Sequence, residues 1–292
     1  MPILPIHTDR LLLRGETAER IVIEHEGEEI GEVDVRRDEA KSQAEITFSI
    51  VPSVQRRRFA GEAVGAMVDA MFAGGELRRI VALLDDRDTA SQSVIEPLGF
   101  RFEGIIRHAS FVDGQWVDRA QFAVVHDDRA AWVARSRTPP ERIEFVELVH
   151  ETARAYANLA THRFQEEFVA PMAASFRHAL LPEAVNGTRA VPWFRGIQAD
   201  SVPVGFLMIA VATDAFPYPY VWRLLIDRWH QRRGIGKRVM TMLINDMRAQ
   251  GHSRLDLSWG EGPGSPAAFY RSLGFVPTGN LIDHEIEAVL NL

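Results

Sequence analysis

The chain has 292 residues, of which 46% are hydrophobic, and a formal net charge of −7. Its length predicts two globular domains, and the negative charge argues against a protein that neutralises nucleic-acid phosphates. The sequence contains no cysteine, which excludes disulfides, thiolate-bound metals and a cysteinyl acyl intermediate. Residues 1–14 do not resemble a signal peptide, and no run approaches the ~18 apolar residues of a membrane span, so we expect a cytoplasmic protein.

The first half of the chain has the pattern of several strands, two helices and a closing hairpin. Its apolar periodicity predicts strands at residues 20–25, 29–35, 44–51 and 79–84, a turn and helix at 55–72, and a helix at 90–97. After these elements, Asp113-Gly114 is typical of a two-residue hairpin turn.

A polar stretch around residues 134–142 separates the two halves. Pro139 and Pro140 disfavour both helix and strand in this stretch, which predicts a linker. We therefore expect a first domain at residues 1–134, a linker at 135–141 and a second domain at 142–292.

The second half repeats the plan of the first, so the two halves read as divergent copies. We predict a strand at residues 143–148, a helical region at 151–184, and strands at 193–197, 204–212 and 220–226. A glycine-containing turn then leads into a helix at 237–250, a strand at 254–259, a helix at 266–273 and two closing strands.

The turn at residues 231–236 has the chemistry of an anion site. Successive backbone N–H groups in a tight turn can surround an anion. Gly234 and Gly236 can take positive φ and let a diphosphate come close, and the next helix directs the positive end of its dipole to the same place. Four side chains add positive charge: Arg232, Arg233, Lys237 and Arg238.

Other phosphate-binding motifs fit this turn less well. A dinucleotide fingerprint would need a third glycine where Val239 stands. A P-loop would need glycine at Gln231 and Ser or Thr at Arg238. The remaining alternative is a strand, turn and helix that bind no ligand.

The turn does not stand alone, because an apolar strand precedes it and Phe269-Tyr270 and Gly274-Phe275 follow its helix. This order resembles the acetyl-CoA signature of the GCN5-related N-acetyltransferases (GNAT). The resemblance implies an α+β fold of the α/β sandwich type, with two tandem GNAT-like domains. Each would be a mixed, mostly antiparallel twisted sheet flanked by helices. It also implies acetyl-CoA as cofactor and direct transfer of the acetyl group to a primary amine.

The resemblance further assigns roles to residues of the second half. Tyr270 would protonate the departing thiolate, and backbone donors on the strand at 220–226 would polarise the thioester carbonyl. Ser265 can cap the helix that carries Tyr270, although Pro263 and Pro266 stand where the family usually has Asn and Ala. The residues expected to bind the cofactor are Leu224, Leu225, Ile226, Gln231, Arg232, Arg233, Gly234, Ile235, Gly236, Lys237, Ser265 and Tyr270.

The base that removes the proton of the acceptor is left open among five carboxylates. Asp227 and Glu261 are preferred, because Asp227 ends the cofactor strand and Glu261 precedes the helix of Tyr270. The other candidates are Glu166, Glu167 and Asp214. The histidines of this half show no metal-ligand spacing, so we expect no metal.

The acceptor is predicted from weaker signals. Residues 165–171, Thr278-Gly279 and the pair Asp283 and Glu285 resemble bacterial spermine/spermidine-type acetyltransferases. An aromatic loop formed by Phe216, Tyr218, Tyr220 and Trp222 could attract an ammonium group by cation–π interaction, or could form a stiff hairpin packed on the core. We expect a polyamine-like amine. The alternatives are an amino antibiotic, a protein N-terminus, or a sensor or scaffold without turnover, and a homodimer is left open.

The first half resembles a degenerate Rim-type acetyltransferase, on the evidence of residues 8–14 and 88–104. Arg58 stands where the first glycine of the phosphate turn belongs, and Ile95 stands where Tyr270 stands in the second half. A side chain at Arg58 fills space that a diphosphate needs, and isoleucine cannot donate a proton. We therefore expect a structural role for this half.

Overall fold

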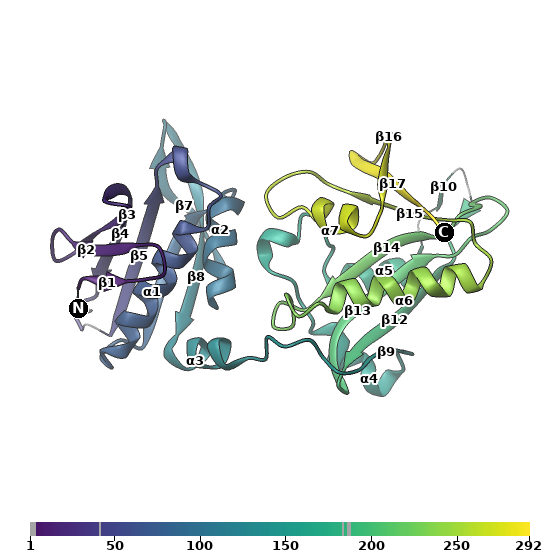
Figure 1. Cartoon of the computed structure of the whole chain (residues 1–292), viewed down its shortest axis with the longest axis horizontal. Coiled ribbons are helices and arrows are strands. Elements are labelled where there is room, and N and C mark those ends of the chain that lie inside the picture. Colours follow the sequence, from purple (N-terminus) through teal and green to yellow (C-terminus); the bar gives the residue numbers. More distant parts are fainter. Residues whose placement is uncertain (1–3, 41, 183, 186–187) are drawn as a thin grey trace. The chain divides into compact units, whose positions relative to one another are not determined.

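The computed structural model describes residues 4–40, 42–182, 184–185 and 188–292, and the chain divides into two compact units, Met1–Arg135 and Ser136–Leu292. Each unit has its own mixed sheet with helices packed on it (Figure 1). The fold expected from the sequence is confirmed in both.

The sheet of the first unit has eight strands in the order β1-β2-β3-β4-β5-β6-β8-β7, and of these pairs β5 and β6 are parallel. The strands are β1 (Ile6–His7), β2 (Leu12–Gly15), β3 (Arg20–His25), β4 (Glu28–Arg37), β5 (Gln43–Ile50), β6 (Arg79–Asp85), β7 (Arg101–Val112) and β8 (Gln115–Val125). The helices are α1 (Phe59–Ala73), α2 (Thr89–Ile95) and α3 (His126–Ala134), with 3-10 turns at Pro52–Val54 and Glu96–Leu98.

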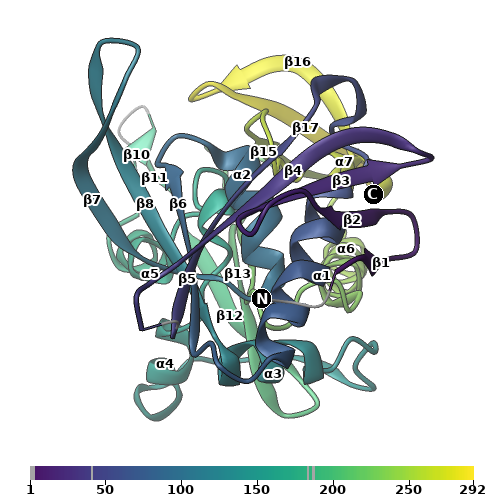
Figure 2. The same cartoon turned by 90° about the vertical axis from the view of Figure 1, so that its left-hand side faces the viewer.

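Helix α1 covers the core of this unit because its apolar side chains recur at helical spacing. Phe59, Val64, Met67 and Met71 are all buried against the sheet. Strands β7 and β8 extend as a long hairpin (Figure 2). Asp113 and Gly114 at its tip both have positive φ, at 50° and 80°, as the predicted two-residue turn requires.

The sheet of the second unit has seven strands in the order β16-β17-β15-β14-β13-β12-β9, and of these pairs β14 and β15 are parallel. The strands are β9 (Ile143–Val146), β12 (Pro192–Ala199), β13 (Val202–Ala210), β14 (Tyr220–Ile226), β15 (Arg254–Trp259), β16 (Val276–Ile282) and β17 (Glu285–Asn291), with a separate pair β10 (Ala184–Val185) and β11 (Thr188–Arg189). The helices are α4 (His150–Ala157), α5 (Met172–Leu180), α6 (Ile235–Ala249) and α7 (Ala267–Ser272), with a 3-10 turn at Arg163–Gln165.

The helical region predicted at residues 151–184 is interrupted, so that prediction is wrong in its middle. Helix α4 ends at Ala157, and α5 begins only after Pro171, which is its N-cap. Proline disfavours helical geometry in the residue before it, which explains why no single helix runs through this stretch. Residue 183 of the predicted range lies outside the described residues.

The centre of the second sheet opens between β14 and β15. The ladder between them has a single register pair, Tyr220 with Asp256. On its other side, β14 pairs with β13 through an irregularity at Trp222, because Met208 faces Arg223 while Ile209 faces Val221. Such a bulge bends the strand and increases its twist. The two central strands therefore separate towards their carboxyl ends.

In the part of the chain that the structure describes, no helix is both long and apolar enough to cross a membrane.

Candidate active site

The N-terminus of α6 forms an open anion site at the end of β14. Gly234 is the N-cap and lies in the left-handed region, with φ of 74°. Among the described residues, the backbone N–H groups of positions 234–237 have no hydrogen-bond partner. A Cβ atom built on Gly234 would meet nothing within 4 Å, so the space beside this glycine is open. A helix start of this kind favours a phosphate.

The helix begins two residues earlier than the sequence suggested, so the expectation of positive φ at Gly236 is wrong. Gly236 is already helical, and Ile235 before it is buried in the core. A Cβ atom at Gly236 would lie 3.5 Å from the ring of Phe269. That distance is an ordinary van der Waals contact, so Gly234 and not Gly236 supplies the glycine conformation of the turn.

The side chains of the turn divide into two groups. Gln231 braces the turn, because its Nε2 donates to Ile226 O at 3.0 Å and to Gln165 Oε1 at 2.8 Å. Arg233 Nε donates to Thr138 O at 2.8 Å. Arg232 and Lys237 are exposed and are the cations of the turn that remain for an anion.

Arg238, the fourth predicted cation, is directed away from this role. Its guanidinium donates to the carbonyls of Pro140 and Glu141, the latter at 3.0 Å. Together with Arg233 it fastens the segment at residues 138–141 to the start of α6.

A narrow cavity of about 50 Å³ lies between the separating strands β14 and β15. Its lining residues include the cofactor-strand residue Leu224 and the predicted proton donor Tyr270. The full lining is Phe168, Val169, Tyr220, Val221, Trp222, Arg223, Leu224, Ser258, Pro266, Tyr270 and Glu285. Leu225 and Ile226, the other two residues expected from this strand, pack into the core.

Tyr270 is held rigidly in the wall of this cavity. Its ring stacks on Trp259 at 6.0 Å and meets Phe275 edge-on at 5.9 Å. Burial raises the pKa of the Tyr270 phenol, and the nearby Tyr220 and Glu285 raise it further. The phenol therefore stays protonated at neutral pH, as a proton donor must.

Three cavity residues that the sequence did not join form a hydrogen-bonded chain. Tyr220 Oη lies 2.5 Å from Ser258 Oγ, and Ser258 donates its hydroxyl hydrogen to Glu285 Oε2. Burial raises the pKa of Tyr220 to about 12, against the effect of the Ser258 hydrogen bond and with the help of the Glu285 charge. The three side chains come from β14, β15 and β17, so no sequence spacing could reveal them.

Asp227 is buried but faces another neighbour. Its Oδ2 accepts from Ala160 N at 2.9 Å and its Oδ1 from Trp229 N at 3.0 Å. These bonds fasten a loop to the end of β14. Asp227 is not among the described residues that line the cavity, and neither are the other four carboxylates suggested as bases. Those four are all exposed: Glu166, Glu167, Asp214 and Glu261.

Ser265 connects α7 to the end of β15. Its hydroxyl donates to Gly260 O at 2.6 Å, and its Oγ accepts from Ala267 N at 3.2 Å. Helix α7 begins at Ala267 with Pro266 as its N-cap, one residue later than predicted. Ser265 thus holds the loop that positions Tyr270.

The first unit keeps the backbone of the anion turn but not its residues. Arg58 is the N-cap of α1 with φ of 65°, and Arg56 has φ of 64°, which matches Arg232 in the second unit. Ile95, at the position of Tyr270, is fully buried. The geometry of the turn has survived in this unit although its glycine has not.

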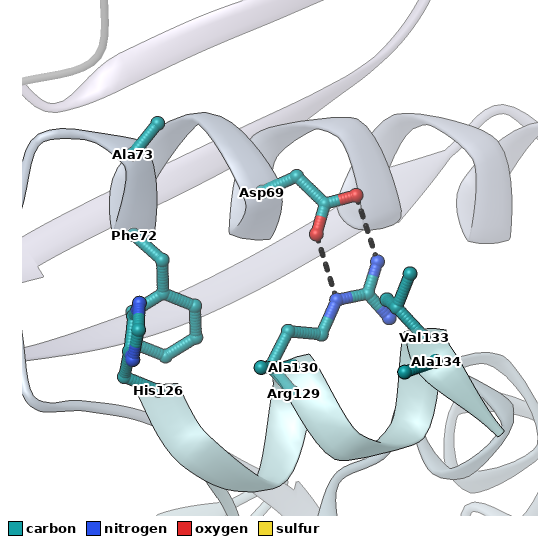
Figure 3. A pocket seen from close by; sticks show the side chains of 8 residues that line it. All are labelled: Asp69, Phe72, Ala73, His126, Arg129, Ala130, Val133 and Ala134. Atoms are coloured by element: carbon teal, nitrogen blue, oxygen red, sulfur yellow. Dashed lines mark hydrogen bonds and ion pairs between the residues drawn. The ribbon is translucent and has the colours of Figure 1, made fainter.

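A larger cavity of about 330 Å³ belongs to the first unit and lies between α1 and α3 (Figure 3). Arg129 crosses it to form a two-point ion pair with Asp69, at 2.7 and 2.8 Å. Phe72 and His126 meet edge-on at 5.6 Å at its other end. These contacts join α3 to the C-terminal half of α1, away from the turn at Arg58.

Comparison with known proteins defines the class. The family model described as "Acetyltransferase (GNAT) domain" matches residues 9–101, and the model described as "Acetyltransferase (GNAT) family" matches residues 153–275. The chain therefore belongs to the GNAT acetyltransferases, which use acetyl-CoA as acetyl donor, and it carries two such domains in tandem. The family predicted from the turn and Tyr270 is confirmed.

Curated relatives include the spermidine N(1)-acetyltransferase of Escherichia coli K12, which is 24% identical over 132 residues, or 45% of this chain and 69% of the relative. The uncharacterised N-acetyltransferase YoaA of Bacillus subtilis is 30% identical over 83 residues, or 28% of this chain and 47% of the relative.

Similar solved structures include a GNAT acetyltransferase from Bacillus anthracis, with TM-score 0.41 and 19% identity over 42% of this chain and 99% of that one. Mycobacterium smegmatis RimJ in complex with CoA-disulfide has TM-score 0.36 and 26% identity over 43% of this chain and 60% of that one.

Proposed function

We propose that the second unit transfers an acetyl group from acetyl-CoA to the primary amine of a small, polyamine-like molecule. The observation that carries this proposal is that one strand, β14, joins the open N-terminus of α6 to the cavity that contains Tyr270. The anion site follows the end of β14, and the cavity beside β14 has the phenol of Tyr270 from α7 in its wall.

The residues of the second unit suit acetyl-CoA. The free N–H groups at 234–237, with Arg232 and Lys237, would hold its diphosphate, because the open space over Gly234 allows close approach. When bound, acetyl-CoA supplies the activated acetyl group. Separation of β14 from β15 leaves room beside Leu224, and Tyr270 would donate its proton to the leaving sulfur.

Two features support a small amine as acceptor. The cavity is narrow and has Trp222, two tyrosines and the carboxylate of Glu285 in its wall, a combination that suits an ammonium group. Two of the relatives are named spermidine N(1)-acetyltransferase. We propose that the first unit is structural, because Arg58 and Ile95 replace the glycine and the proton donor.

The test is a calorimetric titration of the full chain with acetyl-CoA, followed by assays of coenzyme A release. The acceptors would be spermidine, an aminoglycoside and a peptide with a free N-terminus. We expect binding, and release that is fastest with spermidine. Faster release with the aminoglycoside or the peptide would overturn the acceptor class. Binding without release for any acceptor would favour a sensor, and the absence of binding would contradict the proposal.

A further inference from the structure

We propose that Tyr220, Ser258 and Glu285 form an ammonium site with a proton relay, which removes the proton of the acceptor nitrogen. This inference rests on the proposed function of the second unit. It names a route for the proton that uses none of the five carboxylates suggested by the sequence.

The direction of the hydrogen bonds follows from the chemistry of the groups. An ionised carboxylate can only accept, so Ser258 donates its hydrogen to Glu285. The Ser258 oxygen can then accept from Tyr220, 2.5 Å away. Tyr220 uses its hydrogen in this bond, which leaves a lone pair on its oxygen available in the cavity. That oxygen can accept a hydrogen bond from an ammonium group.

The first unit provides an internal comparison for this chain of groups. Tyr220 lies as many residues before Gly234 as Ala44 lies before Arg58, the matching N-cap. The parallel ladders agree with this alignment, because Tyr220 pairs with Asp256 and Ala44 pairs with Ile80. Tyr220 therefore corresponds to Ala44.

The other two members are replaced in the same way. Two residues after Asp256 is Ser258, and two residues after Ile80 is Ala82. Trp259 pairs with Ile286, so the register continues to Gly260 and Glu285. In the first unit the position of Gly260 is taken by Leu84, which pairs with Ala120. Ala120 therefore corresponds to Glu285. All three counterparts are therefore alanines, and Ala44, Ala82 and Ala120 are fully buried in the core. The unit that lacks the proton donor also lacks the whole polar chain. This joint absence indicates that the proton donor and the polar chain serve the same reaction.

The relay balances without any further reactant. The bound ammonium first breaks one N–H bond and gives that proton to the Tyr220 oxygen, which frees the nitrogen lone pair to attack the acetyl carbon. The second proton of the nitrogen leaves as the C–S bond breaks, and it replaces the proton that Tyr270 gives to the sulfur. Tyr220 passes its own hydrogen to Ser258, and Ser258 passes its hydrogen to the Glu285 carboxylate. The carboxylic acid later loses this proton to water. Tyr220 is the catalytic residue of the three, while Ser258 and Glu285 act through it.

Other charges around the relay are few. Arg223 on β14 also lines the cavity, but its guanidinium donates to Trp222 O at 2.6 Å and lies 3.2 Å from His178 Nδ1. Its charge lowers the pKa of Tyr220 and that of Glu287 on β17 raises it, while Tyr270 on α7 stays neutral. Glu287 is occupied elsewhere, because it accepts from Thr278 Oγ1 at 2.6 Å and from Asn280 Nδ2 at 3.0 Å. Glu285 is thus the negative charge that the cavity wall offers to a cation.

The first test is the pH dependence of kcat/KM for spermidine in the wild type, Glu285→Gln and Glu287→Gln. An enzyme that binds ammonium and removes the proton itself has a flat profile from pH 6 to 9, well below the amine pKa of about 10. The Glu285→Gln variant should react only with the unprotonated amine, whose fraction rises about tenfold per pH unit. Its kcat/KM should therefore be about 10²-fold lower than that of the wild type at pH 7 and rise about tenfold per pH unit. Glu287→Gln should keep the wild-type profile.

Ser258→Ala separates the relay from the charge. It breaks the chain but keeps the Glu285 carboxylate, and alanine occupies the same place in the first unit. We expect the steep pH profile of Glu285→Gln with a KM within about twofold of the wild type. Rates lowered by the same factor at every pH in Glu285→Gln and Ser258→Ala would show a merely structural role and overturn the relay.

The second test needs no turnover, so it distinguishes failure of this inference from failure of the proposed function. Spermidine is titrated calorimetrically into the protein saturated with coenzyme A. We expect Glu285→Gln to raise the Kd of spermidine at least about tenfold. Glu287→Gln should leave this Kd within about twofold of the wild-type value. Equal affinity in all three proteins, or no binding to the wild type, would overturn the ammonium site even if acetyl transfer to another acceptor is found.

Discussion

At the scale of single residues, the chemistry of the cavity depends on two phenols in different surroundings. Tyr270 is enclosed by Trp259 and Phe275, while Tyr220 donates into a polar chain that ends at Glu285. Both have raised pKa values, so both are neutral near pH 7. The first can give a proton and the second can pass one on, which is the division of labour that amide formation requires.

Removal of the Tyr270 hydroxyl should affect rate and not cofactor binding. Tyr270→Phe keeps the ring contacts with Trp259 and Phe275, so the fold should persist. We expect kcat to fall about 10²-fold, because one positioned proton donor is lost, and the Kd of acetyl-CoA to change less than about twofold. Coenzyme A release and calorimetry measure the two quantities. Unchanged kcat would show that another group protonates the sulfur.

The raised pKa of Tyr220 also predicts how stability depends on pH. Its folded pKa of about 12 lies above the unfolded value of about 10, so the folded state holds the proton more tightly. The resulting stability is fully present below pH 10 and is lost as the pH rises towards 12. Between pH 9 and 11 the wild type should lose about 1 kcal/mol more of its free energy of unfolding than Tyr220→Phe. Urea unfolding at both pH values measures this difference, and equal losses would contradict it.

At the scale of elements, the sequence predicted what local pattern controls. Strands β14 and β15 were found at their observed bounds, and the turn at Gly234 was placed correctly, because alternating apolar residues and glycine act within a few positions. The start of α6 was missed by two residues, since the burial of Ile235 in the core is a tertiary contact. The Tyr220–Ser258–Glu285 chain was not predicted, because it joins three strands that only the sheet brings together.

The start of α6 can be tested by filling the space above it. Gly234→Arg introduces into the second unit the residue type that the first unit has at the matching position, Arg58. The new side chain would occupy the anion site. We expect acetyl-CoA affinity to fall at least about 10²-fold. Gly251→Arg is the matched control, because Gly251 also has positive φ, at 83°, and open space around it at the other end of α6.

Both Gly234→Arg and Gly251→Arg should cost about 1 kcal/mol of stability, since each forces a side chain into the left-handed region. Only Gly234→Arg should show reduced affinity for acetyl-CoA in a calorimetric titration. Equal binding by both variants would place the cofactor elsewhere.

At the scale of the whole molecule, the chain holds two copies of one fold that differ at the same functional positions. The first unit keeps the sheet, the helix start and even the positive φ values at Arg56 and Arg58. In place of the glycine it has Arg58, whose side chain occupies the space of the anion site. In place of the proton donor and the three relay residues it has Ile95 and three alanines, which are buried in the core. Core packing determines the fold and is preserved despite these differences, so the family resemblance is visible in both units. The residues proposed for acetyl transfer are present in the second unit.

This asymmetry predicts one acetyl-CoA per chain. A ligand stabilises only the unit that binds it, by about 2.7 kcal/mol at a concentration of 100 times Kd. Scanning calorimetry should therefore show one unfolding transition that moves up by several degrees with acetyl-CoA and one that does not move. Gly234→Arg should abolish the shift and leave both transitions in place. A stoichiometry of two, or a second transition that also moves, would mean that the arginine turn of the first unit binds the coenzyme despite its side chain, and that this unit is not merely structural.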